Sequence, residues 1–353
     1  MDDRAARPDM RGMTHPARPR RPAAALDLPP SFRDARGAAR RVGVEVEFTG
    51  LGARAAARAL AAGLGGTAVE ERDPHAFRVR GTRLGDLAVE LDLRHAHPRA
   101  HADTLPFRLG PRAAAWLGSA LGPVVPRELV TAPLPAARLA EVDEAVDVLR
   151  RAGAGGRGTT WSGSLGLHLN VDPPGLDAAT LAAFLRAFVL LEPRLRREAV
   201  GDAPPRWWRP AFLPAPFPAG YARLVLAPGY RPDLAGLAGD YLAANPTRDR
   251  GLDLLPVLLH LDPARVRAAL PREKVGARPA LHYRLPRARV GEPGWGVAPA
   301  WDGWAAVERL AGDPDRLAAL ARAYPGHAEA EAEAEAARAR RAGPGPAAAG
   351  PSR

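Results

Sequence analysis

Polar residues of a particular kind alternate with apolar residues in four short segments of the chain. The segments are 44–48 (VEVEF), 89–93 (VELDL), 167–171 (LHLNV) and 281–285 (LHYRL). Successive side chains of a β-strand point to opposite faces, so each segment is predicted to be a strand with one apolar and one polar face. The polar positions hold four carboxylates, two imidazoles, an amide and a guanidinium. These groups bind divalent metals and phosphate, so such strands in one sheet would form a metal- and phosphate-binding surface.

Three glutamates and one histidine of these strands are the first candidate metal ligands. Glu45, Glu47 and Glu90 supply hard oxygen ligands, and His168 adds a nitrogen on the same expected face. Mg²⁺ prefers a few carboxylates together with water and substrate phosphates, whereas Mn²⁺ also accepts an imidazole. Neighbouring carboxylates repel one another unless a cation lies between them or the pKa of one is raised. A bound metal would relieve the repulsion and supply an electrophile for phosphoryl transfer.

Three arginines are the candidate phosphate-binding residues. Arg248, Arg278 and Arg284 could each donate two parallel hydrogen bonds to phosphate oxygens. Most arginines of a protein lie at its surface, and Arg284 is distinguished because it belongs to the alternating strand pattern. The simplest alternative for all four strands is a solvated sheet face, which alternates in the same way. Solvated faces usually mix Thr, Ser, Lys and Gln, which these positions lack.

Length, composition and charge exclude several classes of protein. The 353 residues can form one large domain or two ordinary ones, and without cysteine neither disulfides nor thiolate chemistry is available. Of the net charge of +11, +5 falls in segment 1–41, which carries ten arginines and five aspartates. No motif with interleaved aromatic residues predicts a specific nucleic-acid site. Without an apolar stretch long enough for a membrane span or signal peptide, we expect a soluble cytoplasmic protein without membrane contact.

The remaining patterns predict a single α+β domain, with a curved, mostly antiparallel sheet and helices packed on its apolar face. The expected helices are 53–62, 136–152, 177–199, 252–261 and 301–324; the expected further strands are 76–80 and 278–286. Segment 1–40 is predicted to be a disordered Arg/Pro-rich tail, the domain to span 41–325, and 326–353 to be a low-complexity tail. Segment 201–235, rich in proline and aromatic residues, is expected to be irregular and to form a lid or substrate wall.

Several ordered motifs resemble the amidoligase family. The motifs are 43–50 (GVEVEFTG), 89–92 (VELD), 245–248 (NPTR), 252–256 (LDLLP), 278–286 (RPALHYRLP), 292–295 (EPGW) and 304–310 (WAAVERL). The resemblance covers about 41–325. It implies a carboxylate–amine ligase with a glutamine-synthetase-like fold, in which a sheet of mainly antiparallel strands carries a Mg-ATP site on its concave face.

The resemblance also implies roles for individual residues. Glu45, Glu47 and Glu90 would be metal ligands, joined by His168, which forms a His-x-Asn motif with Asn170. Asn170, Arg248 and Arg278 would be cofactor-binding residues. Where glutamine synthetases carry Glu-x-Arg on the last strand, this chain has His282-x-Arg284. One metal position would therefore exchange a carboxylate for the imidazole of His282, which leaves the number and identity of the metals open. Arg284 would bind phosphate or the substrate carboxylate.

The implied reaction uses ATP to join a carboxylate to an amine. The γ-phosphoryl group would transfer to the carboxylate to give an acyl phosphate, which the amine then attacks. Asp92 or Glu47 could take the proton from the attacking ammonium group, and the sequence does not choose between them. The substrates would be small-molecule or peptide carboxylates and amines, and the family resemblance is compatible with a homo-oligomer.

Three other functions fit parts of the sequence. A phosphohydrolase could use the same carboxylate and imidazole face without an amine acceptor. A non-catalytic peptide-binding module could keep the fold without its chemistry, although we would expect it to have lost at least one polar strand pair. A non-specific nucleic-acid binder would depend on the basic tail and would lose affinity steeply with salt.

Overall fold

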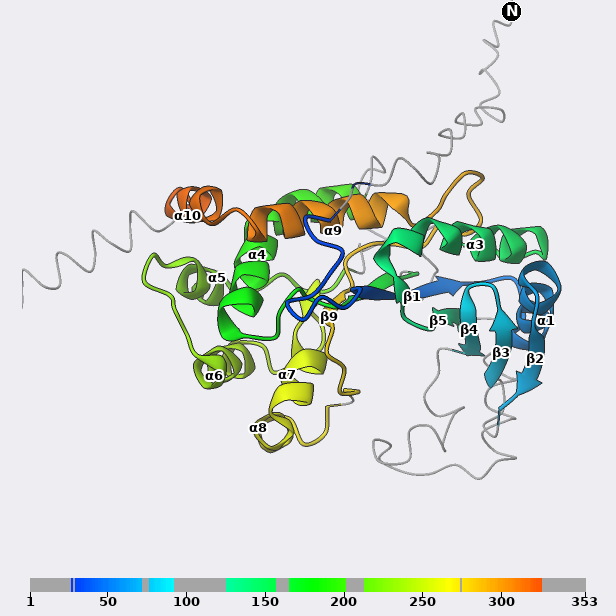
Figure 1. Cartoon of the computed structure of the whole chain (residues 1–353), viewed down its shortest axis with the longest axis horizontal. Helices are drawn as coiled ribbons and strands as arrows, with labels where there is room; N and C mark the ends of the chain where they lie inside the picture. Colours follow the sequence, from blue (N-terminus) through cyan, green and yellow to red (C-terminus); the bar gives the residue numbers. More distant parts are fainter. Residues whose placement is uncertain are drawn as a thin grey trace, which may run out of the picture.

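A computed structural model describes residues 27, 29–71, 76–91, 125–156, 165–200, 213–273 and 275–325 (Figure 1). In this part of the chain nine strands form one sheet in the order β2-β3-β4-β5-β1-β7-β9-β8, with β6 beside β1. The strands are β1 Arg41–Phe48, β2 Thr67–Glu70, β3 Ala76–Thr82, β4 Gly85–Leu91, β5 Arg127–Thr131, β6 Leu134–Pro135, β7 Leu167–Val171, β8 Leu252–Asp253 and β9 Leu281–Tyr283. All the strand pairs described are antiparallel. The α+β class and the antiparallel sheet are confirmed, and the glutamine-synthetase-like fold stays a prediction.

The central strand β1 shows how the sequence pattern produces two different sheet faces. Val42, Val44, Val46 and Phe48 are fully buried on one face of β1. Leu91, Leu167 and Leu169 are likewise buried in β4 and β7, as the alternation predicts. Because side chains alternate along a strand, this apolar face places the intervening glutamates and histidines together on the other face.

Helices cover the apolar face of the sheet. The helices of the described residues are α1 Ala53–Leu64, η3 Ala136–Glu141, α3 Val142–Arg151, α4 Ala178–Val200, α5 Ala219–Leu226, α6 Leu234–Ala244, α7 Leu255–Leu261, α8 Pro263–Ala269, α9 Ala298–Ala311 and α10 Pro314–Arg322. Figure 1 shows α3, α4 and α9 on one side of the strands. On that side the Tyr283 ring of β9 lies 5.5 Å from Trp304 of α9 and 6.0 Å from Phe188 of α4, centroid to centroid. These aromatic contacts fix the end of the sheet that carries His282.

Proline and capping residues explain most differences from the predicted boundaries. The predicted strand 278–286 is paired only over Leu281–Tyr283, because Pro279 and Pro286 have no N–H to donate to a ladder. The predicted helix 301–324 is two helices, because Asp313 caps α10 by accepting from the Arg316 N–H and Pro314 begins it. The predicted helix 252–261 begins with a short strand instead, because Leu252–Asp253 pairs with β9.

The prediction that 201–235 is irregular is wrong for Ala219–Leu226, which forms α5. Phe217 and Tyr221 are buried, and the Phe217 ring packs edge-on against Phe188 at 6.1 Å. Phe217 and Tyr221 therefore serve the core, and Pro218 lies directly before the first residue of α5. Residues 201–212 lie outside the described part of the chain.

The packed region begins upstream of the predicted start at Arg41. The Arg40 guanidinium pairs with the Glu308 carboxylate through two hydrogen bonds of 2.8 and 2.6 Å, and both residues are buried. Trp304 Nε1 also donates to Glu308, at 2.6 Å. This pair ties the segment before β1 to α9. Residues 1–26 and 326–353, which include most of the predicted tails, lie outside the described residues.

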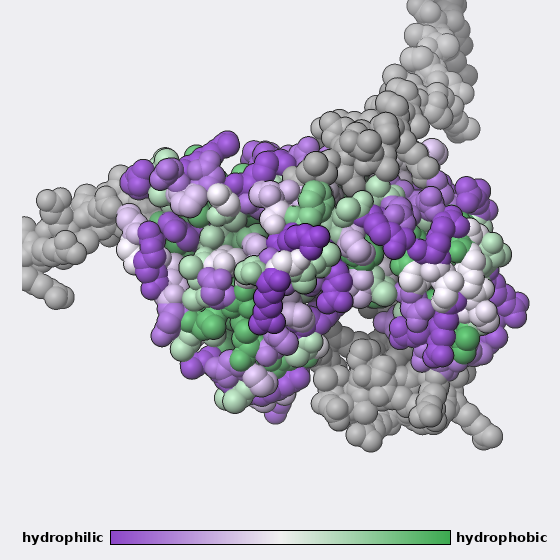
Figure 2. All heavy atoms as spheres, viewed as in Figure 1, coloured by the Kyte–Doolittle hydropathy of each residue, from purple (hydrophilic) through white to green (hydrophobic). Residues whose placement is uncertain are grey.

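The surface view separates polar and apolar regions. In Figure 2 hydrophobic residues gather around α6 and α7, while hydrophilic residues prevail around α10 and the β2–β3 edge. Leu224 of α5 and Leu234 of α6 are among the exposed large hydrophobic side chains. In the described residues, no helix combines the length and apolar character that a membrane crossing requires.

Candidate metal centre

Three glutamates stand in a row across adjacent strands on the polar face. Glu128 of β5 is paired with Glu47 of β1 on one side and with Glu90 of β4 on the other. Residues directly opposite in an antiparallel pair point to the same face, with Cβ atoms about 4.5–5.5 Å apart. The row therefore combines two predicted ligands with Glu128, which the sequence analysis missed. The available signal was the alternation of Glu128 with buried Leu129 and Thr131, in a segment too short to stand out.

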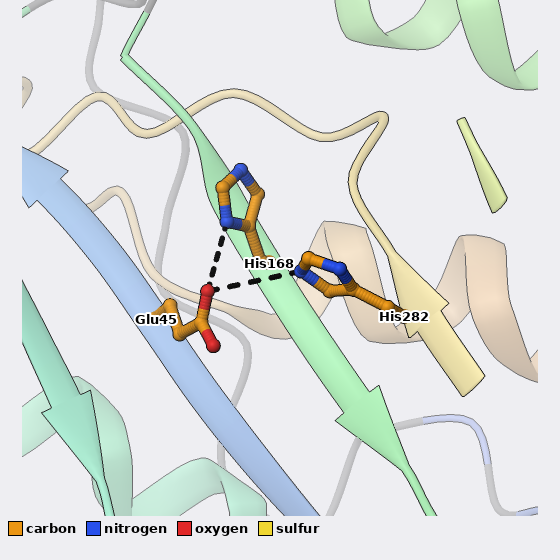
Figure 3. Close-up of side chains that lie close together, drawn as sticks. All are labelled: Glu45, His168 and His282. Carbon is orange, nitrogen blue, oxygen red and sulfur yellow. Dashed lines mark hydrogen bonds and ion pairs between the residues drawn. The ribbon is translucent and has the colours of Figure 1, made fainter. Parts of the chain in front are cut away.

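A second group joins β1, β7 and β9 (Figure 3). The Glu45 carboxylate lies between two imidazoles: its Oε2 is 3.1 Å from His168 Nδ1 and 3.7 Å from His282 Nε2. The two imidazole rings are 5.3 Å apart and nearly perpendicular. Strand register produces this group, because Glu45 is opposite His168 in the β1–β7 pair. His282 is one strand further on, in β9, which pairs with β7.

Two predicted cofactor-binding residues contact Glu45 as well. Asn170 Nδ2 donates to Glu45 Oε1 at 2.9 Å, and Arg278 Nη1 donates to the same oxygen at 3.2 Å. These contacts hold the carboxylate in a fixed orientation. In the described structure Asn170 and Arg278 thus position a candidate metal ligand.

Asp253 supports His282 from behind. Its Oδ2 is 3.4 Å from His282 Nδ1, and its Oδ1 accepts the Leu255 N–H at 2.9 Å. Asp253 is completely buried, and His282 Nε2 is buried without a hydrogen-bond partner among the described residues. A carboxylate on one ring nitrogen fixes the tautomer and directs the other nitrogen to a ligand. The sequence analysis noted Asp253 only as part of a motif and assigned it no role.

Burial and mutual contacts set the charge states of this group. Burial by itself would raise the pKa of Glu45, but the hydrogen bonds and charges of His168 and His282 outweigh it and hold that pKa well below the ordinary value. Burial lowers the pKa of His168 to about 4, against the opposing attraction of Glu45. Glu45 is therefore ionised and His168 neutral near pH 7, which are the forms that bind metal.

The candidate ligands form two overlapping sets. One set is Glu45, His168 and His282; the other is Glu47, Glu128 and His168; and within each set the ligand atoms lie within 4.8 Å of one another. Four of the five predicted metal ligands fall into these sets. Glu90 belongs to the carboxylate row but to neither set, and Asp92, a predicted base, lies outside the described residues.

A cleft of about 310 Å³ lies beside the second set. Glu47, His168 and Arg284 line it, together with Leu213 and Pro214 of the segment predicted to wall a substrate site. Arg284 Nη1 donates to the backbone carbonyl of Arg248. Arg284 therefore lines the same cleft as the candidate ligands Glu47 and His168, on the polar face that the strand pattern predicts.

Arg248 contacts Asp253, which in turn contacts the candidate ligand His282. Its Nε is 3.3 Å from Asp253 Oδ2. Arg248 therefore supports the residue behind His282, and its predicted role in phosphate binding stays a prediction.

Comparison with known proteins identifies the family. A family model described as "Putative amidoligase enzyme" matches residues 38–306. That span contains both ligand sets and the cleft residues. The comparison with curated proteins found no match, and neither did the comparison with solved structures. The family label supports a ligase activity. Since the match covers most of the sequence, the chain belongs to the amidoligase family.

Proposed function

We propose that the protein is an ATP- and Mg²⁺-dependent carboxylate–amine ligase that forms an amide or isopeptide bond. The observation that carries the proposal is the convergence of two carboxylate–imidazole sets on one sheet face, beside a cleft lined by arginine. Family membership favours this reaction class over others that use such residues. The substrates would be a small-molecule or peptide carboxylate and an amine.

The residues present fit divalent cations. Either Glu47, Glu128 and His168 or Glu45, His168 and His282 would hold a cation. Because a neutral imidazole has one ring nitrogen free to bind a metal, His168 would serve one set at a time. The buried His282 Nε2 makes no hydrogen bond in the described structure and has Glu45 Oε2 3.7 Å away, a distance at which a cation between them could bind both atoms. Carboxylates suit Mg²⁺, and the imidazoles would also admit Mn²⁺. A bound cation would neutralise charge on the transferring phosphoryl oxygens.

The protein groups would orient the reactants and move one proton. The substrate carboxylate oxygen attacks the γ-phosphorus of ATP, which forms an acyl phosphate and releases ADP. The amine then attacks the acyl carbon, and the carbon–oxygen bond breaks to release phosphate. Arg284 would bind the phosphoryl or carboxylate oxygens. Glu47 or Asp92 would accept the proton that the amine loses.

Nucleotide binding tests the proposal. Calorimetry with ATP in the presence of Mg²⁺, Mn²⁺ or EDTA should show binding only with metal, weakened at least about tenfold in Glu45→Gln. Glu198→Gln is the matched control, because Glu198 is exposed on α4, belongs to neither ligand set and forms an ion pair with its helical neighbour Arg194. A folded protein that binds no ATP under any of these conditions would contradict the ligase.

A phosphohydrolase is the second candidate, because its chemistry uses the same metal-binding sets. Product analysis separates the two reactions. A ligase forms ADP in proportion to a new amide and needs both an acid and an amine, whereas a hydrolase releases phosphate without an amine. Equal phosphate release with and without amines would favour the hydrolase.

A further inference from the structure

Arg287 lies at the end of the carboxylate row. Continuing the β1–β7 register places Gly166 beside Glu47, and the Glu47 N–H donates to the Gly166 carbonyl at 3.0 Å. Gly166 in turn forms an antiparallel bridge with Arg287. Opposed residues share a sheet face, so Arg287 points to the same face as the row formed by Glu90, Glu128 and Glu47. Gly166, between Glu47 and Arg287, has no side chain, and the His168 ring occupies the space that a Cβ there would fill, with Nε2 2.4 Å from that position.

A register shift is what brings Arg287 to this face. Leu169 is paired with Tyr283, and Gly166 with Arg287. Three steps along β7 therefore correspond to four steps along the β9 chain, as in a β-bulge. Without the extra residue Pro286 would stand opposite Gly166, and Arg287 would point to the apolar face. The hydrogen bonds on either side, Leu167 N–H to Pro286 O and Ala288 N–H to Leu165 O, both fit the shifted register.

The Arg287 guanidinium presents an unused donor edge. Its Nε and Nη2 are buried and have no hydrogen-bond partner among the described residues, and Arg284 Nε is in the same state. Nε and Nη2 form one side of the guanidinium plane, with parallel N–H groups that match two oxygens of a carboxylate or phosphate. Both arginines line the cleft beside Glu47.

The charge balance around Arg287 also favours an anion. No salt bridge joins Arg287 to a carboxylate in the part of the chain that the structure describes. Burial, and after it the charge of Arg289, lowers the pKa of Arg287 from its ordinary value. A desolvated cation without a partner is costly, and an oxyanion in the cleft would remove that cost. Asp249 also lines the cleft but is exposed, so water screens it.

We propose that Arg287 and Arg284 form an oxyanion subsite in the cleft, next to the Glu47–Glu128–His168 set. The subsite would take a carboxylate or phosphate group of a substrate and hold it beside the cation. This inference rests on the proposed ligase and adds Arg287 as a binding residue. The oxyanion has two sources, the carboxylate of the acid substrate or the terminal phosphate of the nucleotide.

Inorganic phosphate is the first probe. Phosphate without nucleotide should raise the thermal unfolding temperature of the wild type, and its affinity should fall about tenfold to a hundredfold in Arg287→Gln. Arg287→Lys keeps the charge but not the two parallel N–H donors. Its phosphate affinity should lie between that of the wild type and that of Arg287→Gln. Arg289→Gln is the matched control: Arg289 is close in sequence, lies outside the cleft lining and should leave the affinity within about threefold. Mn²⁺ affinity measured on the same variants checks that the site is folded.

Further probes distinguish the two sources. If Arg287 holds the terminal phosphate, Arg287→Gln weakens Mg-ATP but leaves Mg-ADP unchanged. If it holds the acid, both nucleotides bind to Arg287→Gln as to the wild type, whereas acetate, which competes with phosphate on the wild type, loses affinity for the variant. Phosphate affinity unchanged in a folded Arg287→Gln or Arg287→Lys protein, or no phosphate binding by the wild type, overturns the subsite. Failure of the ligase itself would appear differently, as a wild type that binds phosphate but not ATP.

Discussion

Glu128 stands directly opposite Glu47 in the antiparallel β5–β1 pair, so two like charges face each other within the sheet. Directly opposed like charges destabilise a sheet by about 0.2–1 kcal/mol. A cation bound by both would convert that repulsion into attraction. Metal binding at this pair would therefore be linked to the stability of the sheet.

The first prediction uses this link. Glu128→Gln should leave stability in EDTA unchanged or slightly higher, because one of two opposed charges is removed. In Mn²⁺ the wild type should gain more stability than the variant, because ligand binding to the folded state stabilises it. Thermal unfolding in EDTA and in Mn²⁺ measures both effects, with Glu198→Gln as the control. An equal Mn²⁺ gain in Glu128→Gln and wild type would show that Glu128 is not a ligand.

Asp253 should affect metal binding through His282. Asp253→Asn removes the carboxylate that holds His282 Nδ1 and should lower Mn²⁺ affinity about tenfold to a hundredfold, the usual cost of losing such a support. Calorimetric titration with Mn²⁺ checks this. Asp262→Asn is the control, because Asp262 caps α8 by accepting from the Arg265 N–H, belongs to neither ligand set, and asparagine also caps helices. Unchanged affinity in Asp253→Asn would mean that the tautomer is set elsewhere.

Gly166 leaves the space that His168 occupies. A Cβ atom at Gly166 would lie 2.4 Å from His168 Nε2 and 3.2 Å from Glu47 Oε1. Gly166→Ala should therefore displace the ring, lower Mn²⁺ affinity and cost about 1–3 kcal/mol of stability. The same change at Gly239 of α6 meets no atom within 4 Å, and there it should stabilise the helix by up to about 1 kcal/mol. Urea unfolding measures the change in the free energy of unfolding for both variants. A change of the same sign in both would contradict the prediction that Gly166→Ala destabilises the protein and Gly239→Ala stabilises it.

Glu192 of α4 should make stability depend on pH. Burial raises its pKa, and contacts with Arg196 and the Phe217 N–H only partly oppose this. A carboxyl whose pKa is raised by folding favours the folded state below its unfolded pKa of about 4.3, and this contribution is lost as pH rises through the folded pKa. Glu192→Gln should thus gain stability relative to wild type toward neutral pH and lose this advantage in acid. Urea unfolding between pH 4 and 8 tests it, and a pH-independent difference would argue against the raised pKa.

The sequence by itself determined the two faces of the strands and which polar residue types lie on one of them. The alternation in β1 and β7 is a local pattern. Because the apolar residues of each strand must face the core, Glu45 and His168 could be assigned to the polar face without coordinates. The family resemblance, carried by local motifs, was confirmed for the same reason.

Tertiary structure decided which residues complete the site. Glu128 became a ligand candidate only because β5 pairs with β1, and Asp253 became a support only because β8 pairs with β9. Arg287 reached the polar face only through a shifted register, which no periodicity predicts. The physical reason is that alternation is fixed within a strand, whereas strand neighbours and register depend on packing between segments far apart in sequence.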